Sequence, residues 1–69
     1  MARTILIGML RWSEEYDFFV ETNGAGHWQL DVPWLMTEEV ARMVQARVIV
    51  EGSRNAVATL AVSRITELD

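Results

Sequence analysis

The 69-residue chain contains no cysteine. Its stability can therefore come neither from a disulfide framework nor from a zinc site built on thiolates. It has to come from packing or association, because a domain of this length buries only about 60% of the surface that its unfolded chain exposes. One folding unit usually takes roughly 100–200 residues, so residues 1–69 are expected to form a single domain.

Long apolar runs are also missing, since none approaches the roughly 20 residues that span a bilayer. The apolar start of the chain is interrupted by Arg11 and lacks the small-residue cleavage site of a secretory signal. We therefore expect a soluble, cytoplasmic protein with no membrane partner. The chain is 51% hydrophobic and 23% charged, a composition that excludes a disordered polypeptide.

Lysine is absent as well: the six basic residues are all arginines, against ten acids, and the net charge is -4. Generic phosphate binders depend on cationic side chains that release counterions from the nucleic acid. Non-specific nucleic-acid binding is therefore disfavoured. Arginines scattered along the chain could still converge into a local basic patch.

Alternating and β-branched residues predict three strands in the first half of the chain, at 4–12, 16–22 and 27–32. Gly8 lies in the middle of the first strand and predicts a bend. Residues 23–26 read Asn-Gly-Ala-Gly, which tolerate positive φ and predict a hairpin turn between the second and third strands.

The second half begins with a predicted helix. Thr37 precedes two acidic residues and is expected to be the N-cap of a helix over 38–46. Two further strands are expected at 47–52 and 56–65, joined by a tight connection at 53–55.

This order of elements, with the helix between the third and fourth strands, is that of the OB-fold, a five-stranded Greek-key barrel. We therefore expect a mainly β, OB-like barrel with one short helix. An SH3-like barrel, or an open sheet covered by one helix, is the alternative. Alternation places Tyr16 on the core side and predicts Trp28 as the central core residue. The expected inward-facing set is Leu6, Leu10, Phe18, Val20, Trp28, Leu30, Val40, Val44, Val48, Val50, Leu60 and Val62.

Four segments carry a resemblance to a known family: residues 7–10 (IGML), 23–31 (NGAGHWQLD), 47–54 (RVIVEGSR) and 60–65 (LAVSRI). In these segments the chain resembles a family of small, uncharacterised OB-like proteins from sphingomonad-type alphaproteobacteria. The resemblance covers nearly the whole chain. It implies an OB-like fold and a bacterial source, and it implies no activity.

The outward-facing positions of the strands hold a surplus of large apolar residues. Contiguous apolar patches usually mark contact surfaces, so we expect a non-enzymatic binding or assembly module that associates with itself or with another protein. The expected contact residues are Ile5, Ile7, Met9, Trp34, Met36 and Ile49, with Arg11 and Arg64 at the rim. The alternative is that these apolar residues are covered within the monomer.

A second hypothesis is an oligonucleotide-binding module, because OB-folds bind oligonucleotides on the outer face of their second and third strands. Its expected residues are Trp12, Phe19, His27 and Arg54. The same face would carry carboxylates, at Asp17, Glu21 and Asp31, which repel phosphates. This hypothesis therefore ranks second.

No pattern in the chain points to catalysis, a cofactor or a metal. A single histidine beside a hairpin turn, His27, does not specify the three or four ligands of a transition-metal site. The glycines at 24 and 26 lack the following helix of a phosphate-binding loop. No serine has a histidine partner in a recognisable nucleophile arrangement. We expect no enzyme activity.

Overall fold

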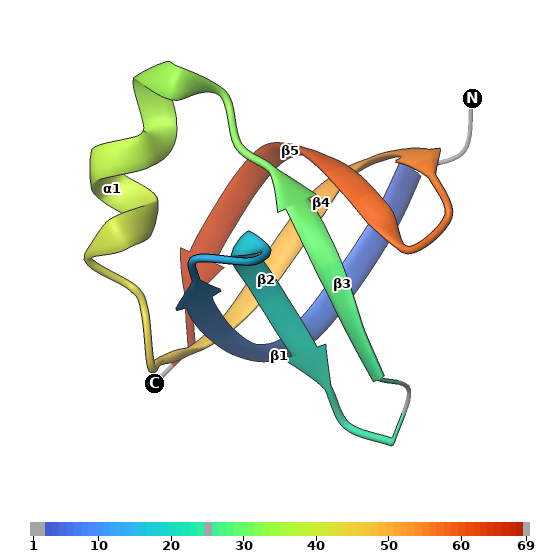
Figure 1. Ribbon diagram of the computed structural model, residues 1–69, viewed down its shortest axis with the longest axis horizontal. Coiled ribbons are helices and arrows are strands. Elements are labelled where there is room, and N and C mark those ends of the chain that lie inside the picture. Colours follow the sequence, from blue (N-terminus) through green and yellow to red (C-terminus); the bar gives the residue numbers. More distant parts are fainter. Residues whose placement is uncertain (1–2, 25, 69) are drawn as a thin grey trace.

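The computed structural model of the chain describes residues 3–24 and 26–68 (Figure 1). Its elements are β1 (Arg3–Ser13), β2 (Asp17–Thr22), β3 (Gly26–Asp31), a 3-10 helix (Trp34–Met36), α1 (Thr37–Ala41), β4 (Arg47–Ala56) and β5 (Thr59–Glu67). The prediction of a mainly β chain with one short helix between its third and fourth strands is confirmed.

The five strands form one sheet that closes into a ring in the order β1-β2-β3-β5-β4. Neighbouring strands are antiparallel except β3 and β5, which run parallel and are joined over a short stretch from Gln29 to Asp31. β1 contacts two neighbours in turn: its second half, from Gly8, pairs with β2, whereas its first half, Arg3–Met9, pairs with β4. The strong curvature of β1 in Figure 1 follows from this change of partner.

Two glycines allow the backbones to approach closely enough for the ring to close. Gly8 lies where β1 passes from one neighbour to the other, and a Cβ atom there would collide with the carbonyl oxygen of Glu21. A Cβ atom at Gly52 would collide with the carbonyl oxygen of Ala61, beside an irregularity in the pairing of β4 with β5. Both positions bend the sheet, and no larger residue fits there without a backbone shift.

Among residues 3–24 and 26–68, nine apolar side chains are buried and form the core: Leu10, Val20, Leu30, Val40, Val48, Val50, Leu60, Val62 and Ile65. All except Ile65 belong to the inward-facing set expected from the sequence. The pairing of β5 shifts between Val62 and Arg64, so the alternation changes phase at Ser63 and turns Ile65 inward.

Trp28 is not the centre of this core, contrary to the sequence-based prediction. It is half-buried and packs against the buried cluster from one side. The fully buried side chains of Leu10, Val20 and Leu60 occupy the centre instead. Trp28 lies two residues after the start of β3, opposite Val20 of β2, and lines a groove at the surface.

The prediction that Tyr16 begins the second strand and faces the core is wrong. Tyr16 lies in the turn before β2, where its backbone N–H donates to the Ser13 hydroxyl at 3.1 Å. Asp17, with φ of 59°, reverses the chain direction, so the alternation of β2 starts after Tyr16. The Tyr16 ring consequently packs outside the sheet, 5.8 Å from the ring of Phe19.

The boundaries of the second half also differ from prediction. β4 continues through Ala56, and the chain reverses at Val57 and Ala58 rather than at 53–55, with a positive φ of 53° at Ala58. The helix ends at Ala41. Thr37 is its first residue and not its N-cap, because the 3-10 helix leads directly into α1 through Met36.

One end of the ring is closed by α1 and its flanking turns. Val40 is fully buried there, and Met36, Met43 and Val44 pack against the same cluster. Within residues 3–24 and 26–68, no helix has the length and apolar character needed to cross a membrane.

Candidate functional site

Four outward-facing apolar side chains lie together on β1 and β4, and we call them the outer apolar strip: Ile5, Ile7, Met9 and Ile49. The register places Ile7 directly opposite Ile49 across the two strands. Ile5 and Ile7 are 54% and 49% exposed, whereas Met9 and Ile49 are partly covered. The structure thus brings together the four strand residues that the sequence pattern selected.

Charged side chains border the outer apolar strip at both of its ends. Arg47 pairs with Met9 at one end, and Glu51 pairs with Ile5 at the other. The guanidinium of Arg64, one of the two expected rim residues, lies 3.9 Å from the Glu51 carboxylate.

The second expected rim residue, Arg11, lies further along β1. Its Nε donates to the Glu21 carboxylate at 2.7 Å, and its Nη1 donates to the amide oxygen of Gln45 at 2.8 Å. Arg11 therefore holds β2 and the segment before β4 together on the outer side of β1.

The two contact residues expected before the helix do not lie on these strands. Met36 is partly buried and packs against the core. A 3-10 helix has three residues per turn, which directs Met36 inward and leaves Trp34 and Leu35 outside. These two side chains are 81% and 78% exposed and form a separate apolar site beside α1.

The residues of the oligonucleotide hypothesis do not share one surface. Phe19 and His27 lie on the outer face of β2 and β3, with ring centroids 5.4 Å apart. Tyr16 joins them, 5.0 Å from the His27 ring, and we call these three the outer aromatic cluster. The sequence analysis missed Tyr16 because its assignment to a strand placed it on the opposite face.

Trp12 and Arg54 lie away from the outer aromatic cluster. Trp12 pairs with Phe18 across β1 and β2 and lines a cleft next to α1. The guanidinium carbon of Arg54 lies 5.8 Å from the centroid of the Trp28 ring. The register shifts between β4 and β5 add a residue to β5 at Ser63 and to β4 only after Arg54, so Arg54 keeps the phase of Val48 and Val50.

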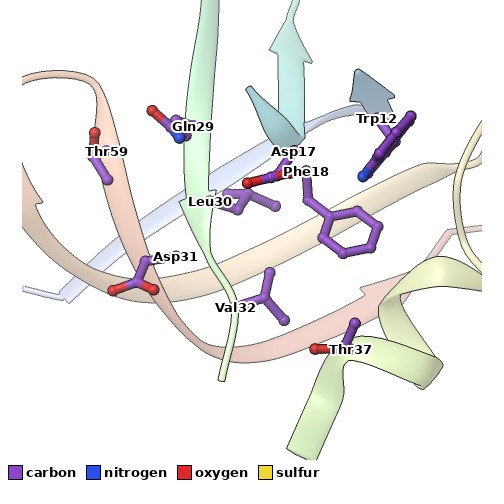
Figure 2. A pocket seen from close by; sticks show the side chains of 9 residues that line it. All are labelled: Trp12, Asp17, Phe18, Gln29, Leu30, Asp31, Val32, Thr37 and Thr59. Atoms are coloured by element: carbon purple, nitrogen blue, oxygen red, sulfur yellow. The ribbon is translucent and has the colours of Figure 1, made fainter. Parts of the chain in front are cut away.

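The cleft beside Trp12 has a volume of about 560 Å³ and lies between the start of β2 and the end of β3 (Figure 2). Phe18 and Leu30 provide apolar walls, while Asp17 and Asp31 place carboxylates at its rim. The side-chain amide of Asn55 donates to Asp31 at 3.4 Å. The cleft is therefore acidic and partly aromatic.

A second depression, which we call the edge groove, runs along the first half of β1 and has a volume of about 810 Å³. It is lined by residues 5–9 of β1, by residues 21–24 at the end of β2, and by Trp28 and Arg47. The groove thus lies where β1 and β2 separate.

Acid/base and metal chemistry gain no support from the arrangement of these side chains. In the part of the chain that the structure describes, no three histidine or acidic side chains converge into a set that could hold a metal ion. His27 packs against the rings of Tyr16 and Phe19.

Comparison with curated proteins and with solved structures gives no match. A family model described as "Protein of unknown function (DUF5818)" matches residues 7–68. The match includes most of β1, the whole of β2 to β5 and the helix between them. Because it covers far more than half of the chain, the protein belongs to the DUF5818 family of proteins of unknown function.

Proposed function

We propose that the protein is a non-enzymatic binding or assembly module, and that it associates with a second copy of itself through the outer apolar strip. The exposure of Ile5 and Ile7 next to Ile49, on the outside of a regular pair of strands, carries this proposal. A side chain in this position adds nothing to the core, whereas contact with another apolar surface would remove it from water.

Self-association suits the size of the chain. A small domain has a thin margin of stability, and a partner that binds only the folded state raises that margin. Two-fold pairing is the commonest form of association between identical subunits, and it uses the same surface on both. The outer apolar strip, with a charged rim at each end, has the anatomy of such a surface.

The test is the solution mass from light scattering over a concentration series, at low and at high salt. A dimer that persists in high salt supports an apolar interface, because salt does not weaken apolar burial. Ile7→Glu should shift the protein to a monomer. The matched control is Val57→Glu, the same change at an 85% exposed residue of the β4–β5 turn, and it should leave the mass unchanged. A dimer that tolerates Ile7→Glu would contradict the proposal.

The fold that we assign to this module is an OB-like Greek-key barrel, in a cytoplasmic protein of bacterial origin. The position of the helix between β3 and β4 and the parallel pairing of β3 with β5 support the OB-like assignment over an SH3-like barrel. An experimental structure superposed on both barrel types would test it.

Oligonucleotide binding is the second candidate function, and the outer aromatic cluster favours it. Aromatic rings gathered on the outer face of β2 and β3 are suited to contact bases. The carboxylates of Asp17 and Glu21 are close in sequence to these rings and oppose phosphates, although Arg11 compensates Glu21. Labelled single-stranded DNA and RNA should bind at low salt, and their affinity should fall steeply as the salt concentration rises. The substitution Phe19→Ala should also lower the affinity. Absence of binding at low salt would exclude this function.

A further inference from the structure

The first half of β1 has a strand neighbour on one side only. β4 pairs with Arg3–Met9, whereas β2 pairs with β1 only from Gly8 onward. Among the residues that the structure describes, no strand pairs with the other side of residues 3–7. In Figure 1 the first half of β1 descends from the N-terminal side at the upper right, whereas β2 ends below it, before the turn to β3.

Such an edge is a template for another strand. In an antiparallel ladder, alternate residues direct their N–H and C=O groups to opposite sides. Part of the backbone of residues 3–7 therefore points away from β4, toward the edge groove. An extended peptide that adds to a sheet edge uses these groups for affinity and uses neighbouring pockets for its alternate side chains.

The edge groove provides apolar surface on both sides of an added strand. Leu6 and Trp28 line it from the inner side of the sheet, and Ile5 and Ile7 line it from the outer side. Trp28 is half-buried, so an added side chain could cover its remaining exposed surface. Apolar side chains of an extended peptide can be accommodated here.

The charges around the groove favour an acidic occupant. Arg47 lines it, and Arg54 lies over the Trp28 ring at 5.8 Å. Within residues 3–24 and 26–68, neither arginine forms an ion pair. The one acid in the lining, Glu21, is held by Arg11 at 2.7 Å. The groove therefore retains positive charge in a chain whose net charge is -4.

We propose that the edge groove binds an extended, acidic segment of a partner protein by strand addition to the first half of β1. A second copy of β1 is a poorer occupant, because residues 3–7 read Arg-Thr-Ile-Leu-Ile and would bring a further positive charge. This site goes beyond the self-association proposed above: Ile5, Ile7 and Met9 line both surfaces, but the unpaired edge of β1 and Trp28 belong to the groove alone.

Trp28 provides the readout for a direct test. Replacing the exposed Trp12 and Trp34 by phenylalanine leaves Trp28 as the single tryptophan of the full chain. The probe is an acetylated and amidated peptide, Glu-Val-Glu-Val-Glu-Val-Glu, titrated at low salt. The expected result is a saturable shift of the Trp28 emission to shorter wavelength, because the peptide removes water from the indole.

Three matched comparisons give the test its specificity. The same peptide with lysine in place of glutamate should bind roughly tenfold or more weakly, because it meets like charges. The acidic peptide N-methylated at every residue keeps its charge but cannot donate to the ladder in either register, and it should cause no shift. Arg47→Gln should weaken binding of the acidic peptide roughly fivefold and leave thermal unfolding unchanged.

Equal binding of the N-methylated peptide would overturn strand addition, and so would the absence of any shift at millimolar peptide. Tighter binding of a short oligothymidylate than of the acidic peptide would reassign the groove to nucleic acid and overturn the proposal. The emission shift and the solution mass report on the two proposals separately. A monomeric protein that shows the shift supports this site and contradicts the proposed dimer. A dimeric protein without the shift supports the proposed dimer and contradicts this site.

Discussion

The two ends of the closed sheet are completed in different ways. At one end α1 covers the ring, and the small side chain of Val40 is fully buried. At the other end, the larger indole of Trp28 is only half-buried and lies under the guanidinium of Arg54. From this comparison we expect that the largest apolar side chain does not contribute most to stability. An aromatic ring that keeps contact with water and with a cation is instead suited to contact a binding partner.

The largest expected effect concerns the closure of the ring, on which both ends depend. Gly52→Val should prevent folding or reduce the free energy of unfolding by at least about 3 kcal/mol, because its Cβ atom would collide with the Ala61 carbonyl. Chemical denaturation followed by circular dichroism measures this loss. Gly24→Asn is the control: a Cβ atom there meets no neighbour, and asparagine tolerates its positive φ. Normal stability of Gly52→Val would indicate that β4 and β5 do not approach closely there.

The covered end should respond strongly to a small change. Val40→Ala removes two buried methyl groups and should lower the free energy of unfolding by about 2–3 kcal/mol. The same substitution at Val57, which is 85% exposed, should change stability by less than about 0.5 kcal/mol. A small effect at Val40 would mean that α1 does not seal the core.

The open end should tolerate a larger deletion. Trp28→Ala removes the whole indole, yet we expect a loss of about 1–2 kcal/mol, because half-buried surface contributes less than the roughly 3–5 kcal/mol of a fully buried tryptophan. Urea denaturation beside Val40→Ala makes the comparison direct. A loss greater than that of Val40→Ala would reverse our ranking of the two ends.

The smallest expected effect concerns the cation above the indole. Arg54→Gln should lower the free energy of unfolding by about 0.5–1 kcal/mol, the magnitude of a cation–π contact near the surface. This loss should disappear in a Trp28→Ala background, which a double-mutant cycle measures. Equal losses in both backgrounds would show that Arg54 and Trp28 do not interact.

The candidate site was only partly predictable. Strict alternation along β1 and β4 identified Ile5, Ile7, Met9 and Ile49, because side chains on successive strand residues face opposite sides. Alternation gives no guide before the helix, where a 3-10 helix packs Met36 against the core and leaves Trp34 exposed. It failed at turns: the positive φ of Asp17 placed Tyr16 outside the sheet, within the outer aromatic cluster.

The amino-acid sequence by itself determined the strand content, the position of the helix and, in the part of the chain that the structure describes, eight of the nine buried apolar side chains. Polar and apolar residues alternate there with the period of a strand. Only the tertiary structure decided the rest. The irregular pairing at Ser63 turned Ile65 inward. The exchange of partners along β1 opened the edge groove, because the sheet can close only if β1 leaves β2 to reach β4. Pairing between distant strands sets both features, and no local pattern records it.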